Sequence, residues 1–233
     1  MIHSQIVREQ NVQEVYPPLE AGDHLNQVDF HTRYERMSED FKAELIAGVV
    51  YVHSSLKRAH GRSHSLLMRW LGCYEDDTAG VEAYDNATTI MGEDSEPQPD
   101  GCLIILPDKG GRTQFTEDDY LQGSPELICE VASSTESFDL HSKKRDYEKS
   151  GVQEYLVVAL RQNKVFWFVH QSGRFEEMPL SPDGLLRSQV FPGLWLDPDA
   201  LLSLDGKRLL HSLRLGLATA EHAAFVKKLY QAK

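Results

Sequence analysis

The 233-residue sequence has few cysteines, no long apolar run and fewer basic than acidic residues. Its three cysteines, Cys73, Cys102 and Cys129, are widely spaced and form no CxxC pair, which argues against a disulfide framework and against a zinc site. Apolar runs such as CLIIL are far shorter than the ~20 residues of a membrane-spanning helix. The N-terminus lacks the apolar core of a secretory signal. We therefore expect a reduced, cytoplasmic protein that does not enter a membrane.

The balance of charge restricts the partners. The chain carries 36 acidic and 24 basic residues, a formal net charge of −12. Phosphate binding depends largely on Lys and Arg, so this composition counts against a protein that coats nucleic acid without specificity. Basic residues do concentrate at 57–69 and at 141–149. Each concentration is consistent either with a local basic groove or with a solvated helix face.

Hydrophobic periodicity predicts a mixed α and β order. Helical spacing of apolar residues predicts a helix over 60–77, and the segments 137–151 and 209–231 are also expected to be helical. Strands are expected at 101–107 and 126–132. Two hairpins are expected, over 43–54 and over 154–170. Together these elements indicate an α+β (α/β-like) protein.

Two apolar strands each carry a carboxylate at a position that is expected to be buried. A buried charge is costly unless it is paired or binds a cation. Asp100 follows Pro99 at the start of GCLIIL, and Glu130 interrupts the run ELICEVA. If the two strands are neighbours, both carboxylates meet and can share Mg²⁺ or Mn²⁺, which favour oxygen ligands. The alternatives are a turn role for Asp100 and a structural ion pair between Glu130 and Lys143 or Lys144. The nearby acids Glu93, Asp94 and Glu96 are interpreted as solvated loop charges.

The order and spacing of three segments resemble the Uma2 family of restriction-endonuclease-like proteins, within the PD-(D/E)XK nuclease superfamily. These segments are QPDGCLII, PELICEVASSTESFDLHSKKRDYEKSGVQEYLVV and VFPGLWLDPDALL. The resemblance implies a restriction-endonuclease-like domain over 30–203, between an N-terminal extension (1–29) and a C-terminal helical tail (204–233). It also implies a mixed central β-sheet flanked by helices, with β-hairpins.

The resemblance also implies an activity: Mg²⁺-dependent hydrolysis of phosphodiester bonds in DNA. Asp100 matches the aspartate of the superfamily motif and Glu130 its second acid, and both would hold the metal. The superfamily lysine normally follows the glutamate by two residues, but Ala132 stands there. A lysine on the next helix, Lys143, takes the corresponding catalytic role in this interpretation. Its alternative is a helix-surface salt bridge with Asp139.

Three further residues are candidates for the same site. Glu44 matches an early acid of the family and is either a third metal ligand or a cross-strand partner in a hairpin. His60 lies at the start of the first long helix and shares a face with His64, so both are expected to line the cleft rather than to form a metal site. Tyr147 lies four residues after Lys143, on the same helix face.

Two classes of function remain open from the sequence. One is a metal-dependent endonuclease acting on DNA, or else on RNA or a nucleotide, since basic residues are few. The other is a catalytically inactive module that keeps the fold for binding or assembly, which Ala132 and the acidic net charge favour. Members of the superfamily often act as homodimers, and a homodimer is therefore a candidate assembly, although no residue here indicates one.

Overall fold

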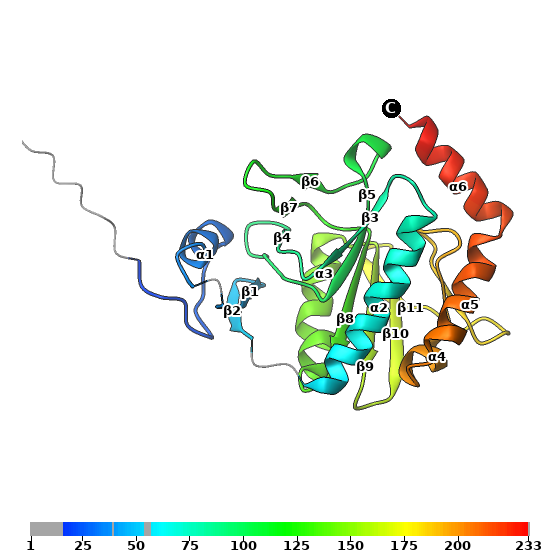
Figure 1. The fold of residues 1–233 in the computed structure, drawn as a ribbon. Helices are drawn as coiled ribbons and strands as arrows, with labels where there is room; N and C mark the ends of the chain where they lie inside the picture. The colour runs from blue at the N-terminus through cyan, green and yellow to red at the C-terminus, as the bar shows by residue number, and fades with distance from the viewer. Residues whose placement is uncertain (1–15, 39, 54–56, 233) are drawn as a thin grey trace, which may run out of the picture.

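A six-stranded mixed sheet forms the centre of the computed structural model, which describes residues 16–38, 40–53 and 57–232 (Figure 1). The strand order is β11-β10-β9-β8-β5-β3. Only β8 and β9 run parallel among these neighbours, and the other pairs are antiparallel. The strands are β3 (Val81–Asp85), β5 (Gly101–Ile105), β8 (Leu127–Ala132), β9 (Glu154–Ala159), β10 (Lys164–Gln171) and β11 (Arg174–Glu177).

Helices cover both faces of this sheet (Figure 1). The helices α2, α4 and α5 pack on one face, and the crossover between β8 and β9, formed by η2 and α3, packs on the other. The helical elements are α1 (Gln27–Tyr34), α2 (Arg58–Asp76), η1 (Pro107–Lys109), η2 (Phe138–Lys143), α3 (Lys144–Ser150), α4 (Pro198–Leu202), α5 (Gly206–Leu217) and α6 (Ala220–Gln231).

The remaining strands form three small sheets beside the central one. One is the hairpin of β1 (Ala43–Ile46) and β2 (Val49–Val52), which carries Glu44. The others pair β12 (Leu186–Arg187) with β13 (Trp195–Leu196), and β4 (Thr89–Ile90) with β7 (Leu121–Gln122) and β6 (Gln114–Phe115). The hairpin and α1 share a separate apolar cluster that includes Phe30 and Leu45.

The apolar pattern of each element explains which face it buries. In α2, Leu67, Trp70, Leu71 and Tyr74 recur at helical spacing and are fully buried against the sheet, as the sequence predicts. Every residue of β8 is buried, which is expected for a strand with helices on both of its faces. Alternate residues of β8 therefore belong to the two opposite cores, and Glu130 is the charged exception.

The structure confirms the expected α+β class with its mixed sheet, flanking helices and hairpins, and it differs in two helices. The predicted helix over 137–151 begins as the π-helix η2, in which the Tyr155 hydroxyl donates to the Asp139 carbonyl at 3.0 Å. A side chain that enters the main-chain hydrogen-bond ladder is one of the recognised causes of a helix kink. The predicted tail helix is two helices, α5 and α6. Thr219 is the N-cap of α6, because its hydroxyl accepts from the His222 N–H.

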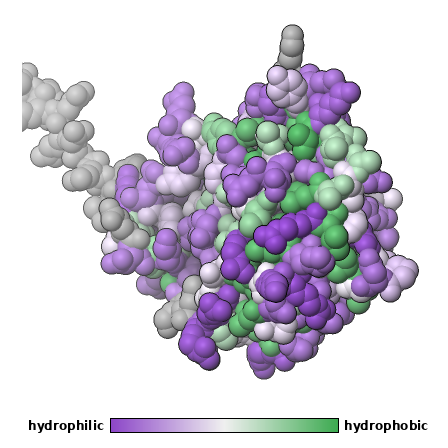
Figure 2. Space-filling model, turned by 45° about the vertical axis from the view of Figure 1, so that its right-hand side comes forward, coloured by the Kyte–Doolittle hydropathy of each residue, from purple (hydrophilic) through white to green (hydrophobic). Residues whose placement is uncertain are grey.

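The predicted extension lies partly beyond the described residues, because its first fifteen residues fall outside them. Among the described residues, no helix combines the length and the apolar character needed to cross a membrane. Figure 2 shows polar side chains over much of the viewed face, with smaller apolar areas between them. The large apolar side chains are instead concentrated in three buried clusters.

Leu67→Ala tests the importance of the core between α2 and the sheet. Leu67 is fully buried, so we expect a loss of ~2–5 kcal/mol in the free energy of unfolding, measured by urea denaturation. The matched control is Leu215→Ala in α5, where the side chain is 49% exposed and the expected change is within about 0.5 kcal/mol. Equal losses in the two variants would contradict this description of the core.

Candidate active site

The register of two adjacent strands brings Asp100 and Glu130 together. β5 pairs with β8 so that Gly101 lies opposite Cys129. One step further along this antiparallel pair, Asp100 lies opposite Glu130. The Asp100 carboxylate oxygen Oδ2 accepts from the Val131 N–H at 2.7 Å, and the Asp100 N–H lies 3.5 Å from Glu130 Oε2. The two residues therefore lie opposite each other on adjacent strands, and each carboxylate lies near a main-chain N–H of the other strand.

Glu130 is held by two side chains from the crossover helices. Lys143 Nζ and the Tyr147 hydroxyl donate to the same oxygen, Oε1, at 2.9 and 2.8 Å. Lys143 Nζ also lies 2.9 Å from Glu44 Oε2 on β1. All four side chains are buried. Lys143 thus joins the central sheet to the hairpin. Its ion pair with Glu130, one of the alternatives that the sequence leaves open, is present, and its side chain is buried rather than on the helix surface.

Negative charge exceeds positive charge around this ion pair. The carboxylates of Glu44, Asp100, Glu130 and Asp139 surround the single ammonium of Lys143. Burial raises the pKa of Glu130 well above its ordinary value, and the neighbouring carboxylates raise it further against the opposing effect of Lys143. Burial likewise raises the pKa of Asp139 to about 6. Burial alone would lower the pKa of Lys143, but Glu130, Glu44 and Asp139 together raise it above its usual range.

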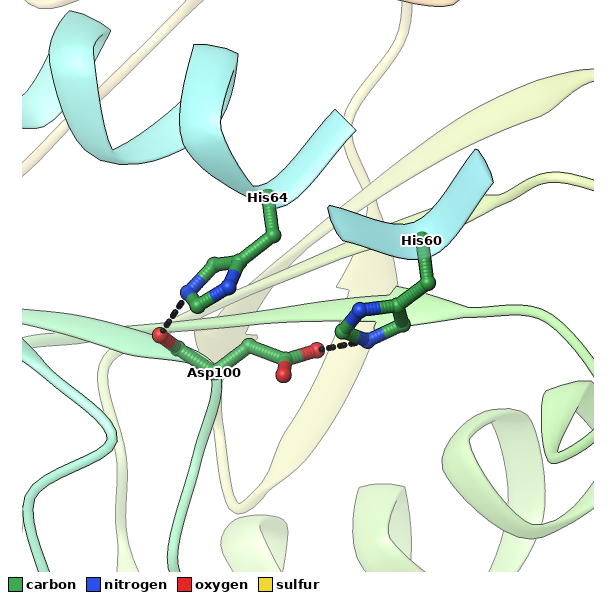
Figure 3. A group of neighbouring side chains, drawn as sticks. All are labelled: His60, His64 and Asp100. Carbon is green, nitrogen blue, oxygen red and sulfur yellow. Dashed lines mark hydrogen bonds and ion pairs between the residues drawn. The ribbon is translucent and has the colours of Figure 1, made fainter. Parts of the chain in front are cut away.

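Two histidines of α2 point at Asp100 (Figure 3). His60 Nε2 lies 3.2 Å from Asp100 Oδ2, and His64 Nε2 lies 2.7 Å from the Asp100 carbonyl. A carbonyl accepts and cannot donate, so His64 Nε2 carries a proton there. The hydrogen bond to Asp100 raises the pKa of His60 against the effect of burial. In turn, His60 lowers the pKa of Asp100, although burial acts in the opposite direction.

The donor set fits a hard divalent cation better than a nitrogen-ligated metal. His60, His64 and Asp100 place one ligand atom each within 4.8 Å of the others, but both Nε2 atoms already point at Asp100 oxygens. Asp100 Oδ1 accepts no hydrogen bond from any described residue, and Glu130 Oε2 has only the 3.5 Å contact from Asp100. Two weakly engaged oxygens in a region of surplus negative charge match Mg²⁺ or Mn²⁺.

These side chains open onto a cleft of about 1260 Å³, lined from the hairpin, α2, the ends of β5 and β8, and η2. Glu44, His60, Asp100, Glu130 and Lys143 all line it, whereas Tyr147 supports Glu130 from behind. The sequence does not reveal two other lining residues. His53 ends the hairpin and lies 3.5 Å from Glu44, and Asp139 is buried beside Lys143. The sequence signal for Asp139 is that it lies four residues before Lys143, on the same helix face.

Two buried acids lie beside the hairpin that carries Glu44: one binds the turn of the hairpin and the other binds α1. Asp146 on α3 accepts from the Ala47 N–H at 3.2 Å and from the Ser95 hydroxyl at 2.5 Å. Glu96 accepts from Gln27 at 2.7 Å and lies 2.8 Å from His31 Nδ1. The prediction that Glu96 is a solvated loop charge is therefore wrong, because its side chain is enclosed between α1 and the loop before β5.

The sheet, its flanking helices and this acidic cleft define a nuclease-like α+β fold. The chain belongs to the Uma2 family, because a family model described as "Putative restriction endonuclease" matches residues 28–199. Its structure is similar to the crystal structure of a "putative nuclease belonging to DUF820" from Anabaena variabilis ATCC 29413, with a TM-score of 0.58 and 17% sequence identity. That similarity covers 74% of this chain and 96% of the other. A search of curated proteins found no significant match.

Lys143→Met tests the central ion pair in the absence of metal. Removing the ammonium leaves Glu130 and Glu44 buried without it, so we expect a loss of ~3–5 kcal/mol in the free energy of unfolding at neutral pH. Urea denaturation in the presence of a chelator measures it. The neighbouring Lys144→Met is the control, because Lys144 instead lies over the Phe168 ring at 3.8 Å, a contact worth about 1 kcal/mol. A loss no larger than in the control would argue against the central pair.

Asp146→Asn tests the attachment of the hairpin through pH. Burial raises the pKa of Asp146 from 3.8 to about 6, so the folded protein keeps a proton that the unfolded chain has already lost. The free energy of unfolding should therefore fall as the pH rises from about 4 to about 6. In Asp146→Asn this fall should shrink by on the order of 2 kcal/mol. Asp108→Asn, which removes an exposed acid that pairs with Lys109, should leave the fall in place. An unchanged pH profile in Asp146→Asn would contradict the assignment.

Proposed function

We propose that this protein is a metal-dependent endonuclease that hydrolyses phosphodiester bonds of DNA. The observation that carries the proposal is that Asp100, just before β5, lies opposite Glu130 on β8, inside a cleft with Lys143 beside Glu130. Membership of a family described as "Putative restriction endonuclease" supports the same proposal.

The candidate metal ligands are Asp100 and Glu130, through the two oxygens that protein donors leave weakly engaged. A bound Mg²⁺ or Mn²⁺ would supply positive charge at the phosphate and acidify the attacking water. The N–H of Val131 donates to Asp100, and a residue's N–H and C=O point to the same side of a strand, so the Val131 carbonyl also faces this position. His60 holds the Asp100 carboxylate in orientation from the other side.

Lys143 takes the role that a lysine at position 132 would otherwise have. Ala132 is fully buried among apolar neighbours of the second core, so that position offers no polar group to the cleft. Lys143 instead reaches Glu130 from η2, near enough to orient the attacking water or to stabilise charge on the phosphate. Tyr147 and Glu44 each hold one member of the Glu130–Lys143 pair and thereby fix its geometry.

A second candidate function is a catalytically inactive module for binding or assembly. The observation that favours it is the double ion pair of Lys143 with Glu44 and Glu130, which partly satisfies the acids without metal. Calorimetry with Mn²⁺ separates the two functions. Binding that Glu130→Gln abolishes contradicts the inactive module, and absence of binding in the unaltered protein contradicts the nuclease.

Cleavage of single-stranded DNA and of plasmid DNA with Mg²⁺ or Mn²⁺ tests the activity directly. We expect Asp100→Asn to slow cleavage at least ~100-fold, because a carboxylate ligand contributes several kcal/mol through the metal. Asp85→Asn is the matched control, since it removes an equal charge from a side chain that lies near His64 and is 59% exposed. Cleavage that both variants retain at the normal rate would contradict the proposal.

A further inference from the structure

Two aromatic side chains form one wall of the cleft and have no role in the chemistry proposed above. Tyr51 on β2 and Phe138 on η2 both line the cavity, with ring centroids 4.2 Å apart and planes inclined by 38°. Both side chains are only partly buried. An aromatic pair left partly open to a cavity, rather than enclosed in a core, offers a flat apolar surface to a ligand.

This aromatic wall adjoins the candidate catalytic groups. Tyr51 lies directly opposite Glu44 in the register of the hairpin, so the two side chains share one face. Lys143 Nζ lies 5.6 Å from the centroid of the Phe138 ring. A ligand on Tyr51 and Phe138 would therefore lie next to the Glu44–Lys143 ion pair.

Basic side chains contribute to the same cleft. Lys42, Lys57 and Arg145 line it, and all three are exposed. Within the part of the chain that the structure describes, none of the three forms an ion pair. Arg145 uses only Nε, which donates to the His141 carbonyl at 3.2 Å. These cations suit a few phosphates and are too few for the extended backbone contact typical of duplex binding.

We infer that the cleft binds an unpaired stretch of DNA, with a base stacked on Tyr51 and Phe138 and the backbone near Lys42, Lys57 and Arg145. This inference rests on the proposed function and names its substrate class. A base inside an intact duplex hides both faces in the stack, whereas an unpaired base exposes a face to an aromatic side chain. Stacking also requires less positive charge than duplex wrapping does, in keeping with a net charge of −12.

Fluorescence anisotropy of the full chain with labelled oligonucleotides tests the inference. The ligands are oligo(dT) of about 20 nucleotides, longer than a typical single-strand site, and a duplex of equal length. Ca²⁺ replaces Mg²⁺, and a gel verifies that the strands stay intact. We expect the single strand to bind at least ~10-fold more tightly than the duplex. Equal or tighter duplex binding would overturn the inference, and tighter binding of oligo(U) would overturn the assignment to DNA.

Variants of Tyr51 identify the stacking surface. Tyr51→Ala should weaken oligo(dT) binding about 5- to 100-fold, the range for one stacked base, whereas Tyr51→Phe should retain it. Tyr51→Leu keeps apolar bulk without the aromatic face and should bind as weakly as the alanine variant while melting near the normal temperature. Phe115→Ala, at an aromatic 46% exposed on β6 outside the cleft, is the control and should change nothing. Normal binding by Tyr51→Leu, or an equal loss in Phe115→Ala, would overturn the inference.

The experiments distinguish a failure of the proposed nuclease function from a failure of the inferred substrate class. Tyr51-dependent binding of a single strand without cleavage under any metal would contradict the nuclease alone. Cleavage of duplex DNA that is lost in Asp100→Asn, together with no preference for single strands, would contradict the substrate class alone.

Discussion

The burial of Glu130 in a central strand is the constraint on which the site depends. A carboxylate at this depth is strongly disfavoured unless charges or donors compensate for its lost hydration. The chain supplies the Lys143 ammonium and the Tyr147 hydroxyl, both directed at one oxygen. The second oxygen faces Asp100. One oxygen of the carboxylate is therefore satisfied by two protein donors, while the other has only the long contact from the Asp100 N–H, just before β5.

This arrangement requires several elements to be held in place together. β5 and β8 must keep their register, or Asp100 no longer faces Glu130. The widened turn of η2 accompanies the inward position of Lys143, and the hairpin must remain docked for Glu44 to reach the same ammonium. Away from the cleft, the buried acid Asp146 binds the turn of the hairpin, and the main chain of Glu96 pairs with Leu45 on β1. Stability and the geometry of the site are therefore coupled, and variants in the supporting contacts can alter both.

The strands and their acids could be predicted because each rests on local pattern. In ELICEVA, alternate residues lie on opposite faces of the strand, so the pattern assigns Glu130 to one face and Cys129 and Val131 to the other. In α2, the helical spacing of apolar residues identifies the buried face. The contacts between distant segments could not be predicted in the same way. Glu96 has the sequence setting of a loop charge, and its burial depends on Gln27 and His31, which lie 69 and 65 residues earlier. The Asp139 carbonyl in η2 likewise accepts from the Tyr155 hydroxyl on the following strand, a contact that local pattern does not reveal. The family resemblance supplied Lys143 as an alternative to position 132, and the structure shows how its ammonium reaches Glu130.

The most direct test of the central claim is a crystal structure of the protein soaked in Mn²⁺, with the ion located by its anomalous scattering. The account predicts a single strong peak between the carboxylates of Asp100 and Glu130, with Lys143 still beside Glu130. A peak on the ring nitrogens of His60 and His64, or no peak in the cleft at saturating Mn²⁺, would contradict it.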